Sequence, residues 1–289
     1  MKKYSKGQLK FKRVGLFLAI IFVVILLCSL VMLFGFCLKD EVTVTATSSD
    51  ASKVSDDVAQ NSMPIIIDNL LVGGLYNNTW VSSSKYYLKS VNKANVDINV
   101  YTKEKKAGTY ILKDVYTYGD SVFVNTSYTN YIDEYFAVPF ENYSLISQFS
   151  NAEIQDQDYS YVKRALGTKR IFNNSINILG VYTAYIDATN SIRLICASSS
   201  SKGTFGGVYS AIIAVVNGKP SILQYSYIKD IDDALDFPLY SVEFVADLNG
   251  DGKSEIVTRE VTEFNVTYNI FEYKNSKFTR VLSEIMKGK

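Results

Sequence analysis

The sequence predicts a mainly β protein, in which an N-terminal transmembrane helix precedes an extracytoplasmic antiparallel β domain with one short helix. Three observations predict this class. Residues 14–38 are apolar and carry no charge. From Pro64 onward, apolar and polar residues mostly alternate, which is the period of a half-buried strand. The chain also contains 22 tyrosines, a residue type that suits pleated surfaces. Short strands at regular spacing favour a sandwich or barrel-like domain, either as one unit or in two halves.

The N-terminal segment predicts a signal anchor that is not cleaved. At ~1.5 Å per residue, Val14–Leu38 spans about 37 Å as a helix, more than the ~30 Å hydrocarbon core of a bilayer. Positions 1–13 carry basic residues and no acidic residue, so they are expected to stay in the cytoplasm. These basic residues are Lys2, Lys3, Lys6, Lys10, Lys12 and Arg13. A cleaved signal peptide fits less well, because its apolar core is shorter. A lipoprotein fits less well, because large apolar residues precede both Cys28 and Cys37.

Residues 39–63 are predicted to form a flexible stalk. The segment is rich in Ser, Thr, Asp, Ala and Val and contains no aromatic residue. Such a composition buries too little apolar surface to offset the entropy lost on ordering. The stalk would lift the domain away from the bilayer.

A first β-rich half is predicted over residues 64–150. Strands are expected at 70–76 and 79–82 around an Asn77-Asn78 turn, and then at 96–102, 108–118 and 121–129. The Gly73-Gly74 pair indicates a bulge or a close backbone approach. Residues 134–140 are expected to form an edge strand, because Pro139 cannot donate a hydrogen bond.

A helical seam at residues 151–180 and a second β-rich half at 181–289 complete the prediction. A short helix is expected from Asp158 to Leu166, ending at Gly167. Val216-Asn217-Gly218-Lys219 is a strong hairpin signal. The strands expected in this half are 191–197, 207–216, 220–228, 239–247, 254–261, 266–273 and 277–285. No fixed repeat period runs through the chain, so a complete propeller is not expected.

Composition excludes several kinds of chemistry. The chain contains no histidine, which removes Ser-His and Cys-His pairs and the commonest zinc ligand. Cys196 is the only cysteine after the apolar segment, so the domain must be held together by its core. The net charge of +1 gives no reason to expect a nucleic-acid partner.

The sharpest local motif spans residues 246–257. Asp247, Asn249 and Asp251 alternate, Gly252 allows a tight turn, and Glu255 lies four positions after Asp251. Oxygen ligands at this spacing suit calcium, with the Lys253 carbonyl group as a backbone ligand. The pattern resembles the D-x-[DN]-x-D-G-x-x-[DE] loop of FG-GAP and VCBS repeats, found in integrin propellers and many bacterial surface proteins. That resemblance implies a loop between two strands.

Two other interpretations of this motif stay open. An EF-hand fits less well, because Thr258 takes the twelfth position and strands flank the loop. A simple polar hairpin turn is the other alternative. A second acidic cluster either supplies a further ligand or is a solvated turn; its members are Asp230, Asp232, Asp233 and Asp236.

The expected function is that of a membrane-anchored extracytoplasmic β-rich binding or scaffolding protein with a calcium loop. The resemblance implies a bacterial-type cell surface, where a surface glycan or a protein would be the ligand. The alternative is a carboxylate-dependent enzyme acting on cell-wall or surface glycans, with pairs such as Asp133-Glu134 or Glu134 with Glu141. A sensor is a third hypothesis, although residues 1–13 leave little room for signalling machinery.

Overall fold

The computed structural model describes residues 62–84, 96–103, 105–129, 134–139, 149–167, 176–199, 208–228 and 237–287. All of them belong to one compact unit, Val54–Lys289. The basic tail, the apolar run at 14–38 and residues 39–61 of the predicted stalk lie outside the described residues, as do Asp133, Glu141 and the acidic cluster at 230–236. Among the described residues, no helix is both long and apolar enough to cross a membrane.

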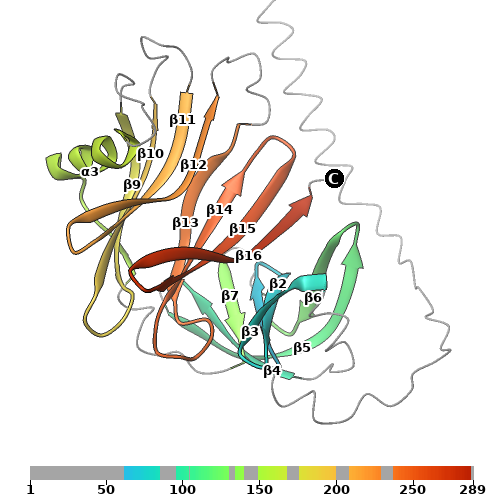
Figure 1. Cartoon of the computed structure of the whole chain (residues 1–289). Helices are drawn as coiled ribbons and strands as arrows, with labels where there is room; N and C mark the ends of the chain where they lie inside the picture. The colour runs from blue at the N-terminus through green and yellow to red at the C-terminus, as the bar shows by residue number, and fades with distance from the viewer. Residues whose placement is uncertain are drawn as a thin grey trace, which may run out of the picture. The chain divides into compact units, whose positions relative to one another are not determined.

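The first half of the domain is a closed β-barrel (Figure 1). Its sheet has the order β1-β7-β4-β5-β6-β2-β3, and β1 also pairs with β2, so that six strands close and β3 extends from β2. The strands are β1 (Ser62–Ile67), β2 (Leu70–Tyr76), β3 (Thr79–Ser82), β4 (Val96–Thr102), β5 (Lys106–Tyr118), β6 (Ser121–Thr126) and β7 (Tyr135–Val138). The barrel-like alternative is therefore confirmed for this half.

The second half contains two antiparallel sheets. The five-stranded sheet has the order β12-β11-β10-β9-β8, and the four-stranded sheet has the order β13-β14-β15-β16. The strands of the first are β8 (Ser150–Asn151), β9 (Ile176–Tyr185), β10 (Ser191–Ser199), β11 (Val208–Val216) and β12 (Lys219–Ile228). Those of the second are β13 (Leu239–Ala246), β14 (Glu255–Val261), β15 (Asn265–Lys274) and β16 (Lys277–Lys287).

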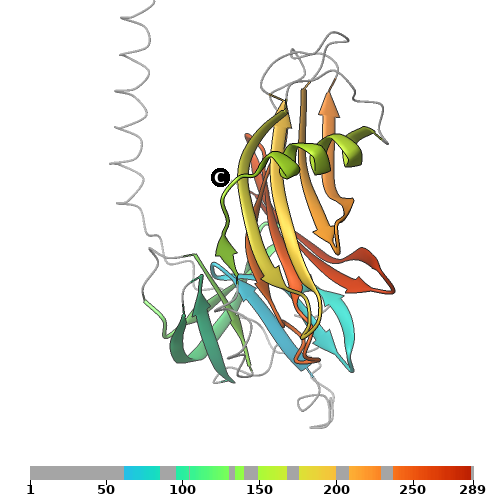
Figure 2. The same ribbon diagram turned by 90° about the vertical axis from the view of Figure 1, so that its left-hand side faces the viewer.

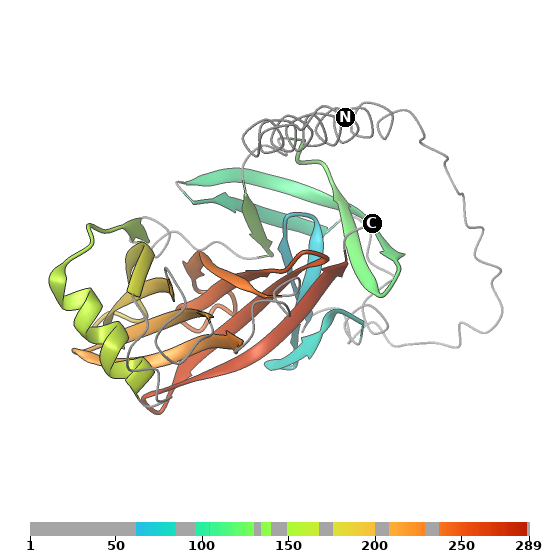
Figure 3. The ribbon, with the colours of Figure 1, turned by 90° about the horizontal axis from the view of Figure 1, so that it is seen from above.

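Apolar clusters join these parts layer by layer. Leu194, Ile212 and their neighbours on the five-stranded sheet pack against Val242 and Ile256 of the four-stranded sheet. The opposite face of the four-stranded sheet packs against the barrel through a cluster that includes Ile270. The two sheets thus follow one another between the helix α3 and the barrel (Figure 3). A separate cluster fills the barrel.

The short helix is confirmed as α3 (Asp156–Gly167), two residues longer at its start than predicted. Val162 and Leu166 lie on its buried side and pack on the outer face of the five-stranded sheet (Figure 2). Asp158 is buried and binds Arg193 of β10 through two hydrogen bonds, Nε–Oδ1 at 2.6 Å and Nη2–Oδ2 at 2.7 Å. In sequence the helix lies between the two halves, and in space it covers the outside of this sheet.

The hairpin turns follow the sequence signals. Asn77 and Asn78 have φ of 50° and 57°, and Asn217 and Gly218 have φ of 50° and 72°. These positive values match the two-residue turns that the right-handed twist of paired strands favours. Gly73 has φ of 150° and lies 2.5 Å from the Val81 carbonyl oxygen, measured from the position of an added Cβ. The predicted close backbone approach is therefore confirmed.

The predicted edge strand before Pro139 is wrong. The strand β7 ends at Val138 and lies between β1 and β4, with Ala137 opposite both Ile66 and Val100. Pro139 follows the last paired residue, so it does not need to donate a backbone hydrogen bond to a neighbouring strand. Three further strands, β1, β8 and β9, were not predicted: β1 contains Pro64, β8 has only two residues, and the first half of β9 lies in the segment assigned to the helical seam.

Candidate functional site

The candidate calcium loop connects β13 to β14 and so lies between two strands, as predicted. Ala246 pairs with Glu255 in the ladder, which brings the two ends of the loop together. Gly250 and Gly252 have φ of 76° and 83°, values that L side chains rarely adopt. The sequence therefore folds locally into a tight loop with acidic residues at both ends.

The Asp247 carboxylate organises the loop by accepting backbone N–H groups. Its Oδ1 atom accepts from Gly250 at 2.6 Å and from Asp251 at 3.2 Å, and its Oδ2 atom accepts from Gly252 at 2.8 Å. Burial raises the pKa of Asp247, although the N–H groups of Gly252 and Gly250 favour the ionised form. Asp247 is thus a buried carboxylate at the centre of a turn.

Glu255 closes the loop from the other side. Its carboxylate accepts the Leu248 N–H at 2.8 Å and the Asn249 side-chain amide at 3.1 Å. Burial raises the pKa of Glu255 well above its ordinary value, and the nearby charges of Asp247 and Asp251 raise it further. A bound cation would relieve this repulsion, because it favours the ionised form of each carboxylate.

The structure brings only some of the predicted ligands together. Asp247, Asn249 and Glu255 share the loop interior, whereas Asp251 and Lys253 are exposed. The Oδ1 atom of Asp251 accepts the Lys253 N–H at 2.9 Å instead of joining the other carboxylates. In the described part of the chain, no group of three or more His, Cys, Asp or Glu side chains is arranged to hold a metal ion. The donor types fit a hard cation, and calcium binding stays a prediction.

The loop is fixed to the neighbouring sheet. Ser254 donates from its backbone N–H to the Ile186 carbonyl oxygen at 2.6 Å and from its hydroxyl group to the Tyr185 carbonyl oxygen at 2.8 Å. The adjoining β9–β10 turn is ordered by Asp187, which accepts from Asn190 and Thr189. These hydrogen bonds lower the pKa of Asp187 to about 2. Two loops from different sheets are therefore held side by side.

A second charged cluster lies where the barrel meets the four-stranded sheet. Lys103, after β4, contacts both Glu134, before β7, and Glu243 of β13, the latter at 3.2 Å. Arg259 Nη1 lies 3.8 Å from Glu134 Oε1. Sequence reasoning named Glu134 and missed Glu243. The available signal was an acidic residue inside the apolar run of β13, at the bulge between Val242 and Phe244.

A lysine lies between this pair of carboxyl groups. Lys103 Nζ donates to both Glu134 and Glu243, to the latter at 3.2 Å. Glycosidases place the glycosidic bond between their two carboxyl groups, whereas an ammonium group takes that place here. The other predicted partners of Glu134 lie outside the described residues, so the enzyme alternative stays untested by this pair.

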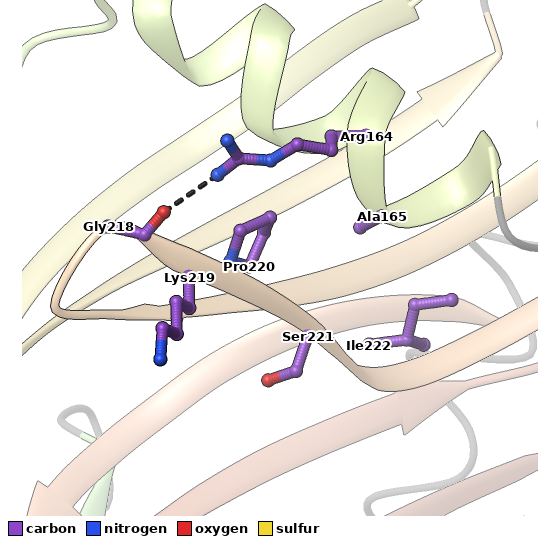
Figure 4. Close-up of a pocket in the computed structure, with 7 residues that line it drawn as sticks. All are labelled: Arg164, Ala165, Gly218, Lys219, Pro220, Ser221 and Ile222. Atoms are coloured by element: carbon purple, nitrogen blue, oxygen red, sulfur yellow. Dashed lines mark hydrogen bonds between the residues drawn. The ribbon is translucent and has the colours of Figure 1, made fainter.

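A pocket of about 520 Å³ lies between α3 and the β11–β12 hairpin (Figure 4). Arg164 donates to the Gly218 carbonyl oxygen at 2.7 Å across its mouth, and Ala165, Pro220 and Ile222 contribute apolar surface. In Figure 4 the side chains of Lys219 and Ser221 point away from the helix. The pocket lining is therefore mostly apolar, with Arg164, which already binds a carbonyl oxygen, and Lys219 as its charged residues.

Exposed aromatic side chains gather on the β5–β6 hairpin. Tyr116 and Tyr118 are 42% and 53% exposed, and Tyr116 stacks on Phe123 at a ring-centroid distance of 5.8 Å. Phe123 packs in turn against the core between the barrel and the four-stranded sheet. Ser121 donates to the Ile285 carbonyl oxygen at 2.6 Å, which brings the exposed Ile285 of β16 beside the hairpin.

Comparisons of the chain with protein-family models, with curated proteins and with solved structures gave no match.

Proposed function

We propose that the chain is a membrane-anchored extracytoplasmic protein whose β domain binds or scaffolds other molecules at a bacterial-type cell surface. Its loop at 247–255 would hold calcium as a structural ion. The anchor and its orientation are supported by the basic residues before the apolar run at 14–38. Calcium is supported by the oxygen-donor set of the loop and by the mutual repulsion of its carboxylates.

The observation that carries the binding role is the aromatic surface formed by Tyr116, Tyr118 and Ile285. The second part of β5 pairs with β6 from Asp114 to Tyr118, so the backbone beneath the two tyrosines is held in a ladder. The stack of Tyr116 on Phe123 links this surface to the core. A tyrosine that is already ordered loses little conformational entropy when it contacts a ligand.

The chemistry of this surface suits a glycan or an apolar segment of a protein. The electron-rich face of a tyrosine ring attracts the polarised C–H groups of a sugar, and its hydroxyl group can hydrogen-bond to polar substituents. Exposed apolar groups that cluster are also typical of sites for protein partners. Of the two, we favour a surface glycan, because alternate residues of one strand present successive tyrosine rings along a line.

The test is a pulldown of the full chain, in detergent, with purified cell-wall material and surface glycans. We expect retention of the wild-type chain and at least a tenfold loss when Tyr116 and Tyr118 are both changed to Ala. Tyr159→Ala is the matched control, because Tyr159 is similarly exposed but lies on α3. Equal retention of the three proteins, or no retention of the wild-type chain, would contradict the proposed surface.

A further inference from the structure

We propose that the pocket between α3 and the β11–β12 hairpin binds a carboxylate attached to a compact apolar group. This chemistry is shared by the C-terminus of a peptide and by a short branched-chain acid. The carboxylate accepts hydrogen bonds from Arg164, and the apolar group lies against Ala165, Pro220 and Ile222 (Figure 4). The site is formed by other elements than the calcium loop and the tyrosine surface, and it does not depend on the membrane anchor.

The size and the lining of the pocket suit a small ligand. Its volume of about 520 Å³ falls within the ~300–1,000 Å³ that is typical of small-molecule sites. Ala165 belongs to the apolar cluster between α3 and the five-stranded sheet, and Ile222 packs against that cluster. The apolar part of the lining is therefore anchored in the core and keeps its shape when the pocket is empty.

Two contacts hold the Arg164 side chain at the mouth of the pocket. Its Nη2 atom donates to the Gly218 carbonyl oxygen at 2.7 Å. Its Cζ atom lies 5.3 Å from the centroid of the Tyr161 ring, which comes one helical turn earlier. The Tyr161 hydroxyl oxygen in turn accepts from Gln157 Nε2 at 2.6 Å. A guanidinium group that is already positioned loses less conformational entropy when it binds an anion.

The charge around the pocket favours an anion. A guanidinium group carries five N–H donors, and the bond to Gly218 uses one of them. Within the described ranges, no carboxylate lies within 4.0 Å of Arg164, whereas Arg193 on the same sheet is paired with Asp158. The described lining contains Arg164 and Lys219 and no acidic residue. The net positive charge therefore attracts a negatively charged ligand.

The position on the helix favours a single negative charge. Arg164 lies in the last turn of α3, where the carbonyl groups carry a partial negative charge. These carbonyl groups repel a dianionic phosphate more strongly than a carboxylate, and the side chain of Lys219 points away from the helix (Figure 4). The planar fork of a guanidinium group also matches the two oxygens of a carboxylate. One arginine beside an apolar pocket therefore suits a monoanionic carboxylate with an apolar body.

Saturation-transfer NMR of the full chain in detergent, with detergent alone as the blank, tests the site with defined probes. N-acetyl-leucine carries both the carboxylate and a branched apolar group, and we expect it to bind with a dissociation constant on the order of 1 mM. N-acetyl-leucinamide lacks the charge, and N-acetylglycine lacks the apolar group. Each should bind at least about tenfold more weakly, because it loses one half of the recognition.

Arg164→Gln should weaken the binding of N-acetyl-leucine by at least about tenfold. The substitution removes the charge and the fork but keeps an amide that can donate to the Gly218 carbonyl oxygen. Lys163→Gln is the matched control, because it removes one positive charge from the neighbouring exposed residue of α3, which does not line the pocket. It should bind within about twofold of wild type, since an exposed charge without a contact is screened.

Isocaproate, which has the leucine side chain and carboxylate without the amide, separates the two sources of the ligand. Binding of N-acetyl-leucine alone supports the end of a peptide, and equal binding of isocaproate supports a free acid. The site is refuted if neither acid binds the wild-type chain at about ten times the expected dissociation constant. Equal binding of N-acetyl-leucinamide, or unchanged binding in Arg164→Gln, would also overturn it. If Arg164→Gln does not fold, the comparison of acid and amide on the wild-type chain decides.

Discussion

Gly73 is the position where one added methyl group should do most damage to the barrel. A Cβ atom there would lie 2.5 Å from the Val81 carbonyl oxygen and 2.9 Å from Leu282 Cδ1. The first neighbour is backbone of the paired strand β3 and cannot rotate away. In addition, φ at Gly73 is 150°, a value that residues other than glycine rarely adopt.

The size of the effect follows from these two terms. Overpacking costs about 1–3 kcal/mol, and the unfavourable backbone angle costs about 1–3 kcal/mol more. We therefore expect Gly73→Ala to lower the free energy of unfolding by about 2–6 kcal/mol. For a domain of this size, that lowers the melting temperature by roughly 5–20 °C.

Gly119→Ala is the matched control. Gly119 also has a positive φ, 59°, but an added Cβ would meet no atom within 4 Å. It should cost about 1 kcal/mol, or roughly 3 °C. Fluorescence of Trp80, the chain's single tryptophan, reports the melting of the strand next to Gly73. Equal and small shifts for both variants would refute the close approach of β2 and β3.

Three further predictions concern the loop, the buried ion pair and the thiol. With ~1 mM calcium and a Kd of ~10⁻⁴ M, calcium bound at the loop 247–255 should stabilise the folded state by about 1.4 kcal/mol, which raises the melting temperature by about 3–5 °C. Asp251→Ala should abolish that shift, and magnesium should raise the melting temperature much less than calcium does. If calorimetric titration shows no heat of calcium binding up to ~10 mM, the loop is a polar turn without a calcium site. Asp158→Asn should cost about 2–3 kcal/mol at neutral pH, because it leaves Arg193 without its carboxylate partner. Burial raises the pKa of Asp158, but the contact with Arg193 and the hydrogen bond from the Gln155 N–H together lower it below its ordinary value. The wild-type chain should therefore lose this advantage as pH falls below about 4, and parallel pH–stability curves would contradict it. Cys196 is buried, and burial raises its pKa to about 12, so Cys196→Ala should melt within a few degrees of wild type in oxidising and reducing buffers alike.

Local signals in the sequence predicted much of the β architecture. Asn77-Asn78 and Asn217-Gly218 specify their hairpins because these residue types tolerate positive φ. The strands of the four-stranded sheet were found because their apolar residues alternate. The choice between a sandwich and a closed barrel was left open, because the pairing of Ile66 with Ala137 joins segments that are far apart and share no local signal.

The candidate sites show the same contrast between local signals, which the sequence reveals, and contacts between distant segments, which it does not. The loop at 247–255 is contiguous, so its spacing and glycines were visible in the sequence. The charged cluster of Lys103, Glu134 and Glu243 was not visible, because only the packing of the barrel on the four-stranded sheet brings these residues together. A single acidic residue in an apolar strand indicates that a buried partner exists, but it does not identify that partner.

The proposed position of the β domain, outside the cell on a membrane anchor, can be tested in intact cells. Protease added to intact cells that carry a C-terminal tag after Lys289 measures this directly, with a cytoplasmic protein as the control for lysis. We expect the tag to be degraded, and we expect the chain, before protease is added, to sediment with the membrane at its full length. A protected tag in intact cells, or a soluble mature form beginning near Thr47, would contradict it.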